Sequence, residues 1–145
     1  MQSTLLSIRT RGPLDDRVCR HRRIFVAAES LVALSGLAGT VQLTAGVATP
    51  PASNLPFGLS SWVLPGLWLF ATVPLPATVA AVLAYRRSPY APLAVLLAAG
   101  TMAIEVLVQI PFIGLNPLQA VFGGVAVALG ALAVHAHRAG WRAGS

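Results

Sequence analysis

The sequence contains no lysine, a single cysteine and only four acidic residues. One thiol, Cys19, excludes an intramolecular disulfide. Charged residues make up 10% of the 145 residues and hydrophobic residues 56%, whereas soluble domains carry roughly 25% charged residues. A water-soluble fold of this size could not cover its surface with so few polar side chains. The composition therefore excludes an ordinary soluble domain and predicts an integral membrane protein in contact with the lipid bilayer.

Catalytic and metal-binding patterns are also missing. The sequence has no glycine-rich phosphate loop, no nucleophile elbow and no paired carboxylates within one motif. His135 and His137 are two residues apart, so on a helix they point to nearly opposite sides, whereas chelation from one face needs a spacing of four. We expect no catalytic residues, no metal and no cofactor, and the sequence favours a protein that is not an enzyme.

Four apolar segments are each long enough to cross about 30 Å of hydrocarbon as a helix, and they cover residues 24–49, 62–85, 92–113 and 118–137. The connections between them are rich in turn formers. The last connection, GLNP, is so short that the third and fourth helices must be antiparallel neighbours. The sequence predicts an all-α, up-down-up-down four-helix bundle over residues 24–137, with basic tails at residues 1–23 and 138–145.

The ten arginines flank the apolar segments. Six precede the first segment, two separate the second from the third, and two follow the fourth (Arg9, Arg11, Arg17, Arg20, Arg22 and Arg23; Arg86 and Arg87; Arg138 and Arg142). The other two connections carry no charge. The positive-inside rule then places both termini and the central connection in the cytoplasm. Orientation in the membrane explains the net charge of +6 better than a nucleic-acid partner does.

The excess of arginine, alanine, glycine, valine and leucine indicates a GC-rich bacterial genome, so we expect a multi-pass protein of the bacterial plasma membrane. The first segment is too long for the 7–15-residue core of a cleaved signal peptide, and Gln42 interrupts it, although small residues near Gly46 keep that alternative open. We expect the N-terminal 20 residues to form a mobile basic tail that is attracted to anionic headgroups.

Small residues recur at helical spacing in the fourth segment (Gln119, Gly123, Ala126, Gly130, Ala133 and His137) and in the first (Ser35, Gly39, Gln42 and Gly46). Such stripes allow close helix packing in lipid. They either hold one compact bundle together or face a second subunit or a membrane-protein partner. In the second segment, Pro65, Pro74 and Pro76 predict a kink near the middle, because proline removes a backbone donor.

Glu105 lies in the middle of the apolar stretch TMAIEVLVQIPF. Thr101, Glu105 and Gln109 are spaced four apart and share a helix face, and Glu105 lies roughly 20 Å from the cytoplasmic start of the segment. Three other polar or aromatic residues are expected in the same outer half of the membrane: Gln42, Trp68 and Gln119. These six residues predict a ligand-binding or proton-linked pocket that opens toward the outer face.

Burial favours the neutral form of a carboxyl group, and no arginine is expected at the depth of Glu105. We expect hydrogen bonds from Gln42, Gln109 or Thr101 to compensate its burial. Three interpretations stay open: a structural hydrogen-bonding post, a proton-linked or cation-binding site, or a contact with a partner. Glu29 is expected near the inner end of its helix, in an ion pair with the neighbouring arginines or reaching toward the interface.

LPFGLSSWVLPG (55–66), the proline-bearing second segment and EVLVQ…NPLQAVFGG (105–124) together resemble a group of small four-span membrane proteins from GC-rich bacteria. The resemblance covers about the last 90 residues. It implies the four-span topology and no particular activity. Small multidrug exporters are a fold-level analogy only, since their essential glutamate lies in the first span and Glu105 lies in the third.

The sequence supports two alternative functions. The chain is expected to be an accessory or interaction subunit, or to bind a small apolar ligand or lipid in the polar pocket of the outer half. The alternative is a small proton-coupled transporter in which Glu105 exchanges a proton for a cationic or apolar substrate.

Overall fold

The computed structural model describes residues 13–47, 49–55 and 58–141. These residues form five α-helices and a short 3-10 helix: α1 (Pro13–Ala45), η1 (Ala52–Asn54), α2 (Val63–Thr72), α3 (Pro74–Tyr85), α4 (Ala91–Ile113) and α5 (Pro117–Arg138). Within them, four stretches are long and apolar enough to cross a membrane: Cys19–Ala45, Val63–Tyr85, Ala91–Ile113 and Pro117–Arg138. The prediction of an all-α four-helix membrane bundle is confirmed.

The first helix differs from its predicted span at both ends. It begins at Pro13, well before residue 24, so at least part of the expected mobile tail is helical. It ends at Ala45, because Gly46 adopts a positive φ of 67°. The N–H of Val47 donates to the Gln42 carbonyl and the N–H of Gly46 to the Leu43 carbonyl, the hydrogen-bond pair of a Schellman cap. Gly46 therefore ends the helix, and a Cβ added there would meet no described atom of this chain within 4 Å. Residues 1–12, 56–57 and 142–145, which belong to the predicted tails and to the LPFG loop, lie outside the described residues.

The second span is broken where the prolines predicted a kink. α2 ends at Thr72 and α3 begins at Pro74, with Val73 between them at φ −119° and ψ −72°. Pro74 has no N–H for the carbonyl one turn earlier, and its ring displaces that turn. Gly36 of α1 makes room for the break, because a Cβ there would lie 2.8 Å from Cδ of Pro74.

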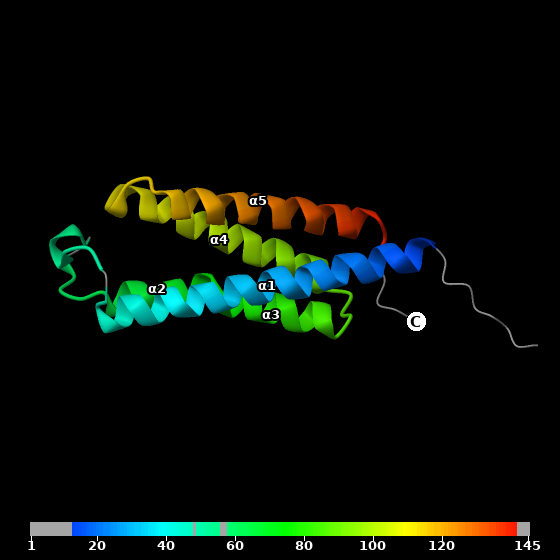
Figure 1. Cartoon of the computed structure of the whole chain (residues 1–145), viewed down its shortest axis with the longest axis horizontal. Helices are drawn as coiled ribbons and strands as arrows, with labels where there is room; N and C mark the ends of the chain where they lie inside the picture. The colour runs from blue at the N-terminus through cyan, green and yellow to red at the C-terminus, as the bar shows by residue number, and fades with distance from the viewer. Residues whose placement is uncertain (1–12, 48, 56–57, 142–145) are drawn as a thin grey trace, which may run out of the picture.

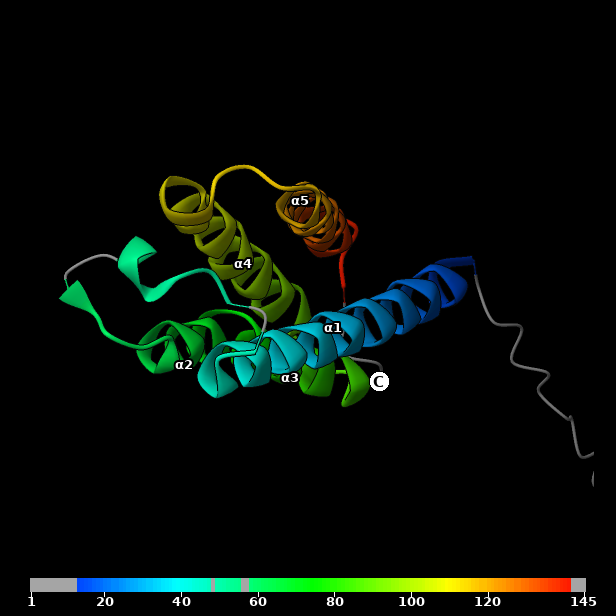
Figure 2. The same ribbon diagram turned by 60° about the vertical axis from the view of Figure 1, so that its left-hand side comes forward.

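Each spanning helix packs mainly against the next one in the chain, and the first and last spans contact each other little. α1 lies along α2 and α3, α3 packs on α4, and α4 pairs with the antiparallel α5 (Figures 1 and 2). The short connection predicted this last pairing correctly. α1 and α5 meet near one end, where the His21 and His135 rings lie 5.7 Å apart between centroids and Phe25 and Trp141 also lie 5.7 Å apart.

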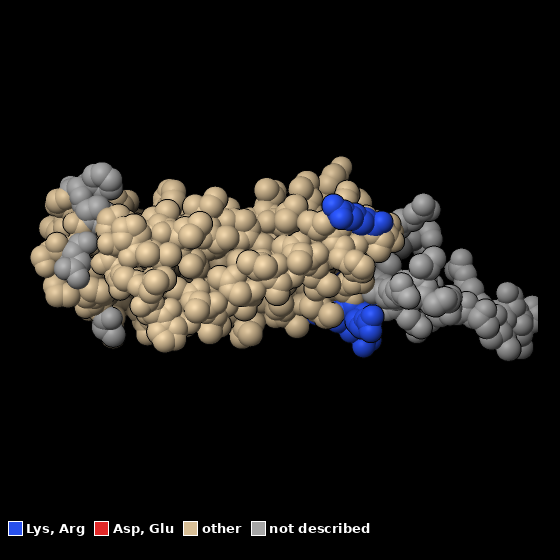
Figure 3. Space-filling model, turned by 90° about the horizontal axis from the view of Figure 1, so that it is seen from above, with Lys and Arg blue, Asp and Glu red and all other residues tan. Residues whose placement is uncertain are grey.

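Every arginine with a described side chain lies at one end of the bundle, formed by the start of α1, the α3–α4 connection and the end of α5 (Arg20, Arg22, Arg23, Arg86, Arg87 and Arg138). We call this the arginine end, and the opposite end, with η1 and the α4–α5 connection, the uncharged end. Figure 3 shows one face of the molecule with arginine at one end only. Placement of the arginine end in the cytoplasm stays a prediction.

Large apolar side chains cover the flanks of the bundle. Leu31, Leu107 and Val127 are 67%, 64% and 73% exposed, among many similar residues. In water such a continuous apolar surface would drive association, whereas lipid accepts it at no cost. The core is built mainly from alanine, as close packing between membrane helices favours.

The small-residue stripe of the fourth span faces α4 of the same chain. Ala126 and Ala133 are 3% and 1% exposed. A Cβ on Gly130 would lie 3.8 Å from Cβ of Ala99, and one on Gly123 would lie 3.9 Å from Val106. Both contacts are ordinary packing distances, so this stripe holds α4 and α5 together within one chain.

Replacing Gly36 by alanine should destabilise the bundle by about 1–3 kcal/mol, because the new methyl group would overlap the rigid Pro74 ring. Gly100→Ala is the matched control, since a Cβ at Gly100 meets nothing within 4 Å. That control should leave stability unchanged or raise it by up to about 1 kcal/mol. Reversible unfolding in mixed micelles measures both changes, and equal effects would contradict the close contact between α1 and the break.

Candidate functional site

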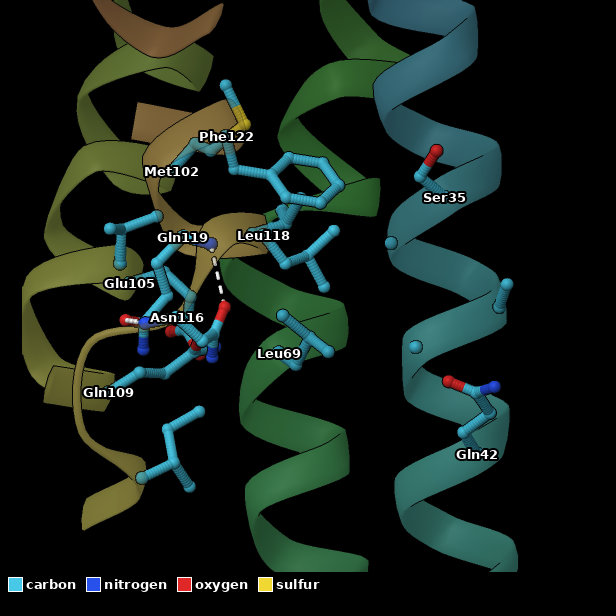
Figure 4. Close-up of a pocket in the computed structure, with 16 residues that line it drawn as sticks. Ser35, Gln42, Leu69, Met102, Glu105, Gln109, Asn116, Leu118, Gln119 and Phe122 are labelled. Carbon is cyan, nitrogen blue, oxygen red and sulfur yellow. Dashed lines mark hydrogen bonds between the residues drawn. The ribbon is translucent and has the colours of Figure 1, made fainter. Parts of the chain in front are cut away.

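A pocket of about 410 Å³ lies between α1, α2, α4 and α5, in the half of the bundle toward the uncharged end (Figure 4). Its apolar walls include Leu69, Val73, Met102, Val106, Leu118 and Phe122, and its polar residues are Ser35, Gln42, Glu105, Gln109, Asn116 and Gln119. Glu105, Gln109, Asn116 and Gln119 gather on one side, and Ser35 and Gln42 of α1 lie on the other (Figure 4).

Glu105 is the only ionisable residue in the pocket lining, and it is 6% exposed. Gln109, one turn later on α4, donates its side-chain amide to Oε1 of Glu105 at 3.0 Å. The Thr72 hydroxyl of α2 donates to Oε2, also at 3.0 Å. Each carboxylate oxygen thus has one hydrogen bond inside the protein, as burial in an apolar bundle requires.

The Thr72 hydroxyl lies within reach of more acceptors than it can serve. Its oxygen is 2.9 Å from the Trp68 carbonyl and 3.3 Å from the Leu69 carbonyl, besides Oε2 of Glu105. A hydroxyl carries one proton and two lone pairs. With an ionised Glu105, the hydroxyl donates its hydrogen bond to the carboxylate. With a neutral Glu105, the hydroxyl donates to the Trp68 carbonyl and accepts a hydrogen bond from the carboxylic acid. The same positions of the heavy atoms therefore satisfy both protonation states of Glu105.

The structure brings four of the six expected site residues to the pocket: Glu105, Gln109, Gln42 and Gln119. Thr101 is not among them, because its hydroxyl donates to the Ala98 carbonyl of its own helix at 3.0 Å. Trp68 is 55% exposed and lies outside the pocket lining. The expected hydrogen bond from Gln109 to Glu105 is confirmed. Gln42 and Thr101 form no such bond, and Thr72 supplies the second one instead.

Sequence reasoning overlooked Thr72, although a depth count would have found it. Thr72 lies ten residues from Trp62, or about 15 Å into its span, and Glu105 lies eight residues from Ile113, or about 12 Å. Both spans are counted from the uncharged end, so the two side chains are expected at similar depth.

Gln119 has a structural role that the sequence analysis did not assign. Asn116 caps α5, its side chain accepts from the Gln119 N–H at 3.0 Å, and Oε1 of Gln119 accepts from the Asn116 N–H at 3.1 Å. The pattern N-P-L-Q is a capping box with proline at the first helical position. Nε2 of Gln119 is buried without a hydrogen-bond partner among the described residues.

Glu29 is placed differently from expectation. It is 1% exposed, and its Oε1 is buried without a hydrogen-bond partner in the described part of the chain. Arg23, by contrast, is exposed, and no ion pair joins Glu29 to a described arginine. The expectation of an ion pair or of reaching toward the interface is wrong, because Glu29 points into the core of the bundle.

Among the described side chains, which begin at Cys19, no group of three or more His, Cys, Asp or Glu is arranged to hold a metal ion. His135 and His137 are both exposed at the end of α5. The chemistry that the pocket offers is thus hydrogen bonding, one titratable carboxyl group and apolar contact.

The fold and the pocket define the class of the protein: a multi-pass four-helix membrane bundle with one buried carboxyl group in a polar pocket between its spans. Comparison with known proteins adds no closer identity, because no protein-family model, no curated protein and no solved structure matches the chain.

A double-mutant cycle tests which threonine holds Glu105. Thr72→Val and Glu105→Met should show a coupling of about 0.5–1.5 kcal/mol in the free energy of unfolding, the usual worth of one hydrogen bond. Thr101→Val is the matched control and should show a coupling near zero with Glu105→Met, because its hydroxyl bonds its own helix. Coupling at Thr101 and none at Thr72 would contradict the described site.

Proposed function

We propose that the chain binds a small amphipathic molecule, taken from the bilayer, in the pocket around Glu105. The observation that carries this proposal is a carboxyl group, buried and hydrogen-bonded, in the wall of an otherwise mostly apolar pocket. Ligand sites in proteins commonly combine such apolar walls with a few polar groups that orient the ligand.

The size of the pocket favours a small molecule over a protein partner. Small-molecule sites occupy about 300–1,000 Å³, and this pocket holds about 410 Å³. One turn of an α-helix, about 10 Å across and 5.4 Å long, would fill roughly 400 Å³. A spanning helix of a partner therefore has no room in it, whereas a single-chain amphiphile does.

The charge of the pocket selects among amphiphiles. The described residues that line the pocket include one carboxyl group and no basic side chain, and the described arginine side chains lie at the arginine end. In a site of low dielectric constant an anionic head beside Glu105 would be strongly disfavoured. The ligand is accordingly neutral or cationic.

The route of entry follows from the packing of the helices. α1 and α5 touch through ring contacts at the arginine end, and both line the pocket toward the uncharged end. A molecule dissolved in the bilayer enters between them without crossing water, which suits an amphiphile.

A proton-coupled transporter is the second candidate, and the Thr72 geometry favours it. Because the hydroxyl suits both protonation states of Glu105, a proton could leave or return with little movement of the helices. Cation binding and proton binding would then compete at one carboxyl group.

The proposal also covers the orientation of the chain, the membrane in which it lies and its contacts with other subunits. The arginine end lies in the cytoplasm, in accord with the positive-inside rule, and the membrane is the bacterial plasma membrane. The likeness to small four-span proteins of GC-rich bacteria fits this setting. Contacts with other subunits would use the lipid-facing flanks of the bundle, since the stripe of α5 is occupied by α4.

Photolabelling with matched probes tests ligand binding. Two probes share one diazirine-bearing alkyl chain and differ in the head, an amine in one and a carboxylate in the other. In bilayers the amine probe should label the peptides of α1 and α5 around the pocket, and the carboxylate probe should not, because it would lie beside Glu105.

Ser35→Phe should abolish this labelling, since Ser35 faces the pocket from α1 (Figure 4). Ala27→Phe is its control, because Ala27 is an exposed small residue of the same helix and does not line the pocket. Labelling that ignores head charge and survives Ser35→Phe would rule out the pocket as the binding site.

Glu105→Gln separates the two candidates. The amide keeps hydrogen-bonding groups but cannot titrate, so a simple binding protein should retain the neutral ligand. A proton-coupled transporter should lose uptake driven by a pH gradient in proteoliposomes. Gradient-driven uptake that persists in Glu105→Gln would exclude Glu105 as the coupling group.

A further inference from the structure

Glu29 is the second buried carboxyl group of the described chain, and it does not line the pocket. Its Oε1 has no hydrogen-bond partner among the described residues. An ionised carboxylate without partners is costly inside a membrane bundle, and such residues mark functional sites by default. Glu105, by contrast, forms hydrogen bonds with Gln109 and Thr72. The two glutamates therefore differ in hydrogen bonding as well as in position.

The surroundings of Glu29 are apolar. Gly36 lies against Pro74, and α1 and α3 run antiparallel, so the register places Glu29 opposite Ala80 and Ala81. Ala80 and Ala84 are both 0% exposed. Alanine side chains offer no hydrogen bond and no charge. They also offer none of the six or more oxygen ligands that a cation such as Ca²⁺ needs.

Aromatic side chains separate Glu29 from the arginine end. His21, Phe25 and Glu29 are spaced four apart and share one face of α1. Phe25 is 0% exposed and lies against the Trp141 ring, with 5.7 Å between centroids. Nε1 of Trp141 donates to the Ser88 carbonyl at 3.0 Å, which anchors the ring to the α3–α4 connection. Phe25 therefore lies between Glu29 and the arginine end on this face of α1, and Trp141 packs against Phe25.

The helices packed around Glu29 carry other titratable groups. Those with described side chains are Cys19, Arg20, His21, Arg22 and Arg23 on α1, Tyr85, Arg86 and Arg87 at the end of α3, Tyr90 and Glu105 on or before α4, and His135, His137 and Arg138 on α5. Apart from Glu105 they lie at or near the arginine end, and among the described side chains none forms an ion pair with Glu29.

We propose that Glu29 is a proton-binding site that Phe25 and Trp141 close. In the closed structure Glu29 carries its proton as a neutral acid. When Trp141 separates from Phe25, water enters, the O–H bond of the acid breaks, and the proton passes to water, leaving a hydrated carboxylate. Closure requires the proton to return, so protonation and the position of Trp141 are linked. This site stands independently of ligand binding at Glu105.

The chain offers a direct measurement, because it contains only two glutamates, Glu29 and Glu105. In a Glu105→Gln protein carrying isotope-labelled glutamate, every labelled carboxyl signal in the infrared spectrum comes from Glu29. At neutral pH the spectrum should show the carbonyl stretch of a protonated acid. Raising the pH should abolish that band and replace it with the carboxylate bands.

The fluorescence of Trp141 tests the proposed link between the protonation of Glu29 and the position of Trp141. In a background with Trp62→Phe and Trp68→Phe, Trp141 is the remaining tryptophan of the chain. Its emission should shift to longer wavelength, and its quenching by acrylamide should rise, over the same pH range in which the Glu29 band is lost. Glu29→Gln should abolish this pH response, and Glu105→Gln, the control carboxyl change, should retain it.

His135→Gln is the control for the nearby rings, and the pH response should survive it, because the proposal assigns the proton to Glu29. Labelled carboxylate bands from Glu29 at neutral pH would overturn the proton-binding site. A Trp141 response that persists in Glu29→Gln would overturn its link to Trp141. If Glu29→Gln does not fold, the labelled Glu105→Gln protein still decides, since protonation of Glu29 and movement of Trp141 must then occur over one pH range.

Discussion

Hydrocarbon supplies no hydrogen bonds, so a polar group within the membrane spans is stabilised by partners inside the chain. The threonines obey this rule locally, as Thr40 donates to the Gly36 carbonyl and Thr78 to the Pro74 carbonyl. Glu105 obeys it across helices through Thr72. Thr72 is the last residue of α2, directly before the proline break, so the break that bends the second span also places the donor that Glu105 needs.

Hydropathy, turn formers and prolines were enough to predict the number of spans, the α4–α5 pairing and a kink near the middle of the second span, because each depends on local sequence. The rotation of a helix about its own axis does not depend on local sequence alone, because packing against the other helices decides it. Glu29 looked like an interfacial residue and is buried at 1% exposure, since only packing against α3 decides which face turns inward. Thr101 shares a helix face with Glu105, but its hydroxyl prefers the Ala98 carbonyl. The start of α1 was missed because hydropathy marks the membrane and not the end of the helix.

The two buried glutamates lie at different depths in the bundle. Phe25 and Ala91 lie near the same end, so Glu29 is about 6 Å and Glu105 about 21 Å further into the bundle, by the rise per residue. Buried residues at intermediate depths, such as Val32 and Ala99, are apolar. One belongs to the proposed ligand pocket, and the other to the proposed proton site beneath Trp141.

The central claim, that the pocket around Glu105 holds an amphiphile from the bilayer, is tested most directly by native mass spectrometry of protein purified in mild detergent. We expect a bound neutral or cationic small molecule on the wild-type protein, which should be lost in Ser35→Phe and retained in Ala27→Phe. An anionic lipid as the bound species, or the same adduct on Ser35→Phe as on the wild type, would contradict it.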